Sequence, residues 1–152
     1  MKSGTSRTLV RRLRLSNMSD CIFCKIVAGE IPAHKVYEDT DALAFLDINP
    51  VNPGHTLVIP KAHHRDLLDM PLELGAKVMN AIQKITPAVL RGVGADSFNL
   101  GVNNGSGAGQ LVFHTHFHIM PRFKNDGHQL WHGKVTGQDE FTKVADSIRK
   151  HL

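Results

Sequence analysis

Three histidines at alternate positions constrain this chain more than any other feature of its sequence: His114, His116 and His118. In a β-strand, side chains at i, i+2 and i+4 point to one face. The sequence therefore predicts one strand after Gln110, with three imidazoles in a row on one of its faces. The other face would carry side chains suited to a core, namely Phe113, Thr115, Phe117 and Ile119. Such a row is costly to bury without partners, but it can bind a metal, handle a phosphate or supply a nucleophile.

The length and composition favour one globular domain. The chain has 152 residues, of which 41% are hydrophobic and 21% charged, as is typical of a soluble protein with a real core. No apolar run reaches the length of a membrane-spanning helix, so we expect no membrane association. Five of the 18 basic residues and none of the 14 acidic ones lie in residues 1–19. The remainder is near neutral, and we expect no nucleic-acid partner.

Residues 1–19 form a basic N-terminal extension that we expect to be disordered or peripheral. Their composition is compatible with a mitochondrial transit peptide over residues 1–17, and they lack the apolar segment of a secretory signal. A simpler interpretation is that translation naturally begins at Met18. We prefer this interpretation, which predicts a cytoplasmic protein, with a mitochondrial location as the alternative.

The pattern of apolar residues predicts both strands and helices. Short runs rich in β-formers predict strands over residues 35–38, 42–46, 56–60 and 97–102. A short helix over residues 20–28 would have Asp20 as its N-cap. A long helix would be capped by Asp69, begin near Pro71 and end at Gly94, with an internal Pro87 as a possible kink. Its buried face is expected to consist of Val78, Ile82, Ile85 and Val89.

Two further segments leave alternatives open. Residues 103–110 are rich in glycine, but they lack the Lys-Ser/Thr ending and precede a strand, so they are not a P-loop. Their backbone amides can still approach a phosphate closely. Cys21 and Cys24 are too few for a secreted disulfide scaffold, and their spacing is compatible with a redox dithiol, metal ligands or coincidence.

Residues 114–120 resemble the signature of the histidine triad (HIT) family, His-φ-His-φ-His-φ-φ with φ apolar, and Thr115 is the one departure. Residues 43–50 and 53–61 also resemble blocks of this family, in the family's order. The resemblance covers about residues 20–122. The longer C-terminal tail is similar to bacterial-type, Hint-like members.

The resemblance implies an α+β, HIT-like fold with an antiparallel sheet of about five strands and helices packed on it. It also implies a homodimer in which the long helices pack together. Residues 20–152 would then form a single HIT domain whose C-terminal tail, over residues 138–151, is helical.

The resemblance further implies a nucleotide hydrolase or nucleotidyl transferase. The substrate would be a purine nucleoside phosphoramidate or a dinucleoside polyphosphate. His116 would attack the α-phosphorus and form a nucleotidyl-histidine intermediate, and His118 would contact the phosphate or assist the leaving group. No organic cofactor is implied.

Ten positions match the family's substrate-binding residues and are expected to surround the base, ribose and phosphate. They are Phe23, Ile26, Phe45, Asp47, Ile48, His55, Asn103, Gly109, Gln110 and Leu111. Within this set, Asp47 would accept a hydrogen bond from a ribose hydroxyl. Leu111 stands where many members carry a serine, which leaves the leaving-group preference open.

Bacterial-type members of the family imply a structural zinc site as well. Its ligands would be Cys21, Cys24, His63 and His114, a Cys2His2 set of the kind that zinc prefers.

Two other functions are compatible with these residues. One is a non-catalytic nucleotide-binding interaction module. The other is a metalloprotein with zinc or iron on the three triad histidines, and the absence of a nearby carboxylate ligand argues against catalytic iron.

Overall fold

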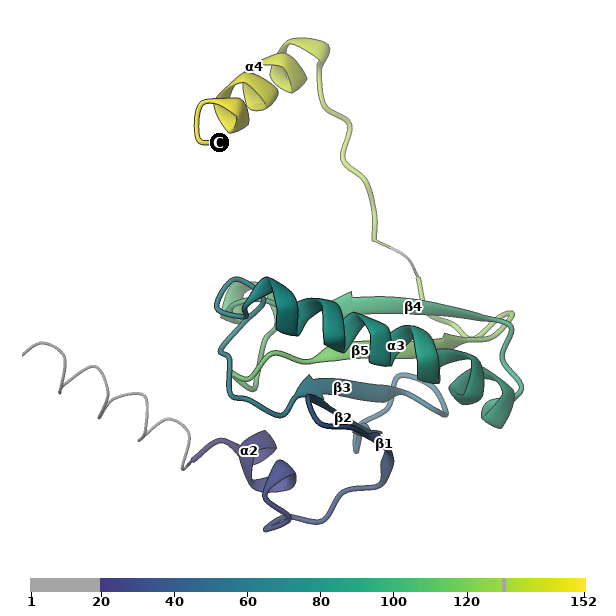
Figure 1. Cartoon of the computed structure of the whole chain (residues 1–152). Helices are drawn as coiled ribbons and strands as arrows, with labels where there is room; N and C mark the ends of the chain where they lie inside the picture. Colours follow the sequence, from purple (N-terminus) through teal and green to yellow (C-terminus); the bar gives the residue numbers. More distant parts are fainter. Residues whose placement is uncertain (1–19, 130) are drawn as a thin grey trace, which may run out of the picture.

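A computed structural model describes residues 20–129 and 131–152. The expected N-terminal extension lies outside these residues. A five-stranded sheet forms the centre of the molecule (Figure 1), with the strand order β1-β2-β3-β5-β4 and antiparallel pairing throughout. The strands are β1 (Lys35–Glu38), β2 (Ala42–Leu46), β3 (Thr56–Pro60), β4 (Ser97–Val102) and β5 (Phe117–Arg122). The predicted α+β fold is confirmed, and four predicted strands have the expected bounds.

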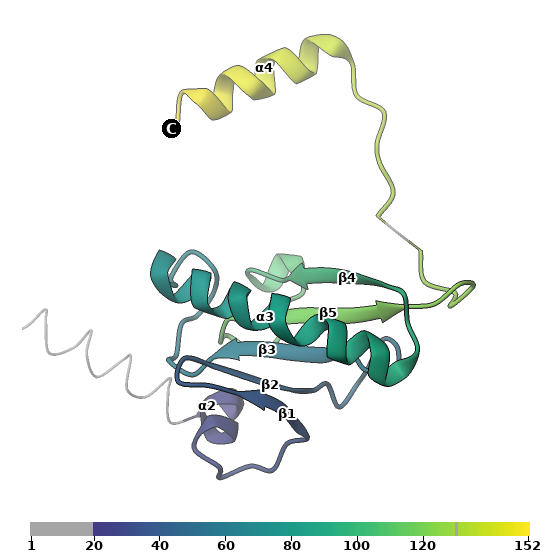
Figure 2. The same ribbon diagram turned by 45° about the vertical axis from the view of Figure 1, so that its right-hand side comes forward.

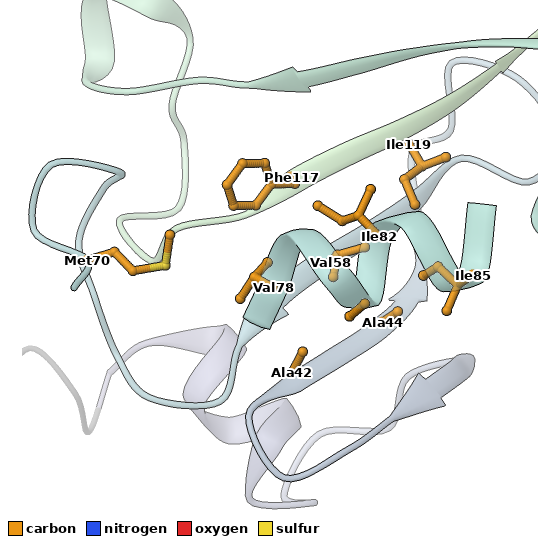
Figure 3. Close-up of a cluster of buried hydrophobic side chains, with 10 residues drawn as sticks. Ala42, Ala44, Val58, Met70, Val78, Ile82, Ile85, Phe117 and Ile119 are labelled. Carbon is orange, nitrogen blue, oxygen red and sulfur yellow. The ribbon is translucent and has the colours of Figure 1, made fainter. Parts of the chain in front are cut away.

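Helix α3 (Leu72–Val93) covers one face of the sheet (Figures 1 and 2). The predicted apolar stripe is confirmed, since Val78, Ile82 and Ile85 are buried and Val89 packs partly buried beside them. These side chains meet one set of alternate strand residues, which Figure 3 shows converging on the helix. That set comprises Ala42, Ala44, Val58, Phe117 and Ile119.

The other face of the sheet carries the short helix α2 (Ile22–Val27). Its buried residues are Phe23 and Ile26, which pack on the alternate residues of β2 and β3, namely Leu43, Phe45, Leu57 and Ile59. Because side chains alternate along a strand, His118 in β5 points to this same face, opposite its neighbours Phe117 and Ile119. Helix α2 therefore lies on the face where the candidate site forms.

The predicted N-caps of both helices are wrong. Cys21 is the N-cap of α2, and Pro71 is the N-cap of α3; neither contributes a side-chain cap. Asp69 instead turns back into its own loop, where its Oδ2 accepts the Arg65 N–H at 3.0 Å. The predicted end of α3 is confirmed, because Gly94 adopts φ 72° and its N–H donates to the Leu90 carbonyl.

Helix α4 (Gln138–Arg149) confirms the predicted C-terminal helix but lies apart from the sheet in both views (Figures 1 and 2). None of its residues is buried, and Phe141, Val144 and Ile148 expose an apolar stripe. Among the described residues, no helix combines the length and apolar character that crossing a bilayer requires.

Candidate functional site

The histidine triad does not lie on a single strand, so this prediction is wrong. Strand β5 begins at Phe117, and only His118 belongs to it. The preceding residues leave the sheet because Thr115 donates both its N–H and its Oγ1–H to the His64 carbonyl, at 2.7 and 3.0 Å. Phe113 is consequently 40% exposed and lies outside the core.

The three imidazoles nevertheless remain neighbours. The ring centroids of His116 and His118 lie 5.0 Å apart. The centroid of the Phe23 ring lies 5.2 Å from that of His116 and 5.9 Å from that of His114, and both pairs pack edge to face. Helix α2 thus packs an aromatic ring against two of the three histidines, and Phe45 packs on that ring in turn at 5.5 Å.

Cys21, Cys24, His63 and His114 converge at the beginning of α2, as predicted for a metal site, and their ligand atoms all lie within 4.8 Å of one another. The sulfur-to-nitrogen distances are 3.3 Å from Cys24 to His63 and 3.5 Å from each cysteine to His114. A tetrahedral zinc ion with ordinary bond lengths would hold such atoms about 3.5 Å apart. The donor set therefore fits zinc in both chemistry and size.

The hydrogen bond of His114 prepares it for this role. Its Nε2 lies 2.8 Å from the Pro60 carbonyl, which can only accept, so Nε2 carries the proton and Nδ1 faces the thiols with a free lone pair. Burial lowers the pKa of His114 to about 4 and so favours the neutral ring that a metal requires. Burial, followed by the adjacent Cys21, raises the pKa of Cys24 to about 12, so metal binding would release its proton.

A second cluster consists of Asp47, His55 and His118, whose ligand atoms also lie within 4.8 Å of one another. The expectation that no carboxylate neighbours the triad is thus wrong. However, the Val51 N–H donates to His55 Nδ1 at 3.1 Å, so the proton of neutral His55 is on Nε2. That nitrogen lies 2.9 Å from His118 Nδ1 and 3.6 Å from Asp47 Oδ2. Because a protonated nitrogen cannot ligate a metal, the cluster is a hydrogen-bonded relay.

This relay fixes the tautomer of His118. Its Nδ1 accepts from His55, so its proton lies on Nε2, a buried atom without a partner in the described part of the chain. Burial, followed by the charges that His116 and His55 would carry, lowers the pKa of His118 to about 4. Burial also lowers the pKa of His55, against the opposing effect of Asp47. Neutral His118 therefore presents an N–H donor to the site at neutral pH.

His116 has the opposite tautomer. Its Nδ1 lies 2.7 Å from the His114 carbonyl, which can only accept, so Nδ1 is protonated and Nε2 keeps its lone pair. The ring is 7% exposed. A nucleophilic nitrogen and an N–H donor thus stand on adjacent rings.

The predicted substrate-binding residues have different surroundings. Phe23, Ile26 and Phe45 form one buried cluster beside His116, whereas Ile48 is 95% exposed. Asp47 accepts the Asn49 N–H through Oδ1 and keeps Oδ2 beside His55.

The glycine-rich loop 103–110 is held from within. Asn103 Nδ2 lies 3.4 Å from the Gly109 carbonyl. Gln110 is buried, and its amide already accepts from the Gly105 N–H and donates to the Arg65 and Val112 carbonyls. These hydrogen bonds hold the loop, and the expectation that Gln110 binds substrate stays a prediction.

Leu111 is 89% exposed and lines a cavity of about 550 Å³. The other lining residues include Cys21, His63, Arg65 and Phe113, while His116 and His118 do not line it. The cavity adjoins the Cys/His cluster.

The residues that hold the loop before His55 were not predicted from the sequence. Asn52, Arg122, Asp126 and His128 form a hydrogen-bonded cluster next to Val51. The turn signals Asn52-Pro53-Gly54 and Asn125-Asp126-Gly127 were visible, but nothing in the sequence indicated that the two turns meet.

The chain is similar to several known proteins over most of its length. The family model for the HIT domain matches residues 28–125. A HIT-like protein from Borreliella burgdorferi is 52% identical over 72% of this chain and 81% of its own. The adenosine 5'-monophosphoramidase hnt1 of Schizosaccharomyces pombe is 45% identical over 87% of this chain and 98% of its own. The adenylylsulfatase HINT3 of Arabidopsis thaliana is 41% identical over 88% of this chain and 70% of its own.

Solved structures agree with these relatives. A HIT family protein from Bacillus subtilis superposes with a TM-score of 0.80 at 42% identity, covering 88% of this chain and 97% of that chain. A zinc-bound histidine triad family protein from Mycobacterium smegmatis gives 0.69 at 41% identity, covering 84% and 91%. Both the sequence match and the shared fold show that this chain belongs to the histidine triad family.

Proposed function

We propose that this protein hydrolyses or transfers a nucleotide by cleaving a bond at the α-phosphate, through a nucleotidyl-histidine intermediate on His116. The observation that carries the proposal is the pairing of tautomers on adjacent rings 5.0 Å apart. His116 offers a lone pair at Nε2, and His118 offers a hydrogen-bond donor, its Nε2–H. Attack on phosphorus requires the first, and departure of a basic leaving group requires the second.

In the first step, His116 Nε2 forms a bond to the α-phosphorus as the bond to the leaving group breaks. The leaving group departs with the electron pair while the His118 Nε2–H donates a hydrogen bond to it, and it takes up its proton from water. Positive charge develops on the His116 ring, and the His114 carbonyl, which accepts from Nδ1 at 2.7 Å, stabilises it. In the second step, water attacks phosphorus and loses a proton to the solvent as the bond from phosphorus to His116 Nε2 breaks, which restores the lone pair of His116 and releases the nucleoside monophosphate.

The proposed binding residues divide by chemistry. The apolar cluster of Phe23, Ile26 and Phe45 would pack against a purine base, with exposed Ile48 closing over it. Asp47 would accept from the ribose hydroxyls, and His55, Asn103 and Gly109 would border the phosphate.

The names of relatives support an adenylate substrate with a variable leaving group. One relative is named as an adenosine 5'-monophosphoramidase and another as an adenylylsulfatase. An amine leaves phosphorus in the first case and sulfate in the second. We therefore propose a purine nucleoside phosphoramidate or a dinucleoside polyphosphate as the substrate, with exposed Leu111 near the leaving group.

The nucleophile can be tested by trapping. Reaction with an adenosine phosphoramidate, quenched rapidly at alkaline pH, should give an adenylyl adduct on the peptide that contains His116. His116→Ala should lose activity by several orders of magnitude, because no other ring offers a nitrogen at the same point, and it should still bind the nucleotide. His118→Ala should retain more activity. Substantial turnover by His116→Ala, or an adduct on His55 or His118, would contradict the mechanism.

We also propose that Cys21, Cys24, His63 and His114 hold a structural zinc ion. The donor spacing supports this, and so does the similarity to a solved zinc-bound member of the family. The ion would join α2 to the segment before β5. Phe23 lies between the two cysteines in sequence and contacts His116, so the zinc would also hold this ring against the nucleophile.

We propose, finally, a homodimer. Strand β4 is an edge strand with Phe98 and Leu100 partly exposed, and an unpaired edge of this kind favours association. Light scattering coupled to size-exclusion chromatography should give twice the mass of one chain, and a monomer mass at micromolar concentration would contradict it.

A further inference from the structure

The carboxylate of Asp126, in the loop after β5, is the centre of a dense hydrogen-bonded cluster. Its side chain is only 6% exposed. Five N–H groups donate to it at 2.7–3.1 Å, namely Arg122 Nε, Arg122 Nη2, Asn52 Nδ2, Phe123 N and His128 N. A buried charge needs such partners, and here Arg122 supplies them as a fork.

This cluster holds the loop that precedes His55. Asn52 donates to Asp126 Oδ2 and to the Pro121 carbonyl, both at 2.9 Å. His128 Nε2 donates to the Val51 carbonyl at 3.0 Å. Two adjacent residues, Val51 and Asn52, are thus bound to β5 and to the loop that follows it.

The position of Val51, whose carbonyl is bound by His128, determines the direction of the hydrogen bonds from Val51 to His118. The Val51 N–H donates to His55 Nδ1, His55 Nε2–H donates to His118 Nδ1, and His118 is left with its N–H at Nε2. If the Val51 N–H moved away, His55 could carry its proton on Nδ1 instead. His55 Nε2 would then accept from His118 Nδ1, and His118 would present a bare lone pair where the leaving group needs a hydrogen-bond donor.

We propose that Asn52 and Asp126 are positioning residues that fix the tautomer of His118 through Val51 and His55. The inference rests on the proposed function for its catalytic consequence, because only a reaction that needs the Nε2 proton would be affected. The direction of the hydrogen bonds from Val51 through His55 to His118 does not depend on any substrate.

A spectroscopic experiment tests the direction of these hydrogen bonds directly. Zinc-loaded protein with ¹⁵N-labelled histidine is examined by long-range ¹H–¹⁵N correlation, which identifies the protonated ring nitrogen. The wild type should carry the His118 proton on Nε2, and Asn52→Ala should show a mixture of tautomers. Asn99→Ala is the matched control, since it removes a 2.7 Å contact to Arg122 Nη1 but leaves Asn52 untouched. If Asn52→Ala does not fold, Asp126→Asn serves instead, because it keeps the side-chain size.

A kinetic experiment separates positioning from general damage. Alkylamine leaving groups are basic and depend on the Nε2–H donor of His118, whereas nitrophenolates leave phosphorus without such a donor. Asn52→Ala should lower kcat/KM at least about tenfold for the amines, as expected when the hydrogen-bond donor to a basic leaving group is lost, and much less for the nitrophenols. Its affinity for the nucleoside monophosphate should be unchanged.

Three outcomes would overturn the inference. They are a wild-type His118 protonated on Nδ1, an Asn52→Ala variant with wild-type tautomers, and an equal loss on both leaving-group classes. If the wild type turned over neither class, the proposed function would fail. The His118 tautomers in wild type and in Asn52→Ala would then be the test of the positioning role.

Discussion

Gly54→Ala should destabilise the protein at the point where the loop before His55 meets the end of α3. Gly54 has φ +83°, a conformation that disfavours a side chain by about 1–2 kcal/mol. An added Cβ would also lie 2.8 Å from Val93 Cγ1 and 3.3 Å from Pro121 Cγ. Forcing extra atoms into such a contact costs about 1–3 kcal/mol. The free energy of unfolding should therefore fall by about 2–5 kcal/mol.

Gly29→Ala is the matched control. Gly29 has φ +78°, but nothing lies within 4 Å of its added Cβ, so only the backbone contribution applies and the loss should be about 1–2 kcal/mol. The entropy that alanine removes from the unfolded chain is common to both variants and cancels in the comparison.

Urea unfolding, monitored by the far-ultraviolet circular dichroism of zinc-loaded protein, measures both losses, with m expected to stay constant. In Gly54→Ala/Val93→Ala the clashing methyl groups are absent, so the double variant should lose less than the sum of its single variants, by about 1–2 kcal/mol. Equal losses in Gly54→Ala and Gly29→Ala, or strict additivity in the double variant, would refute the argument from close packing.

Three further results are expected. Asp47→Ala should weaken binding of a nucleoside monophosphate several-fold in a titration, and 2′,3′-dideoxynucleotides should bind the wild type about as poorly; equal affinity for ordinary and dideoxy nucleotides would exclude a ribose contact. Cys24→Ser should release zinc in metal analysis and lower Tm, because metal binding contributes to folding, whereas untagged wild type that holds no zinc and has two titratable thiols would exclude the site. The pKa of His118 is about 4 when folded and about 6.5 when unfolded, so the unfolded chain binds the extra proton between these values and stability should fall as pH drops from 6.5 to 4. His118→Gln should lose that part of the pH dependence, at most about 3 kcal/mol in urea titrations, and an unchanged profile would contradict the shift.

Much of the fold could be predicted from the sequence because it depends on local patterns. Strands β1 to β4 have the predicted bounds, and α3 buries the predicted stripe, since alternation and helical spacing are properties of neighbouring residues. The Cys/His cluster also assembles as the family resemblance implied. Both predicted helix N-caps are wrong. Whether a carboxylate caps a helix depends on which N–H groups its side chain reaches, and Asp69 accepts from the Arg65 N–H instead.

The histidine triad shows which features the sequence determines and which only the tertiary structure determines. The sequence by itself determined which residues meet, since Phe23 of α2 contacts His114 and His116, and His116 contacts His118. Only the tertiary structure decided that β5 begins after His116, because the His64 carbonyl, 51 residues away, captures Thr115. It also decided every tautomer, because the protons follow backbone groups that folding brings close: the Pro60 carbonyl for His114, the His114 carbonyl for His116 and the Val51 N–H for His55. Imidazole has two nearly equivalent nitrogens, so the chemical role of each ring is set by the hydrogen bond that its other nitrogen makes.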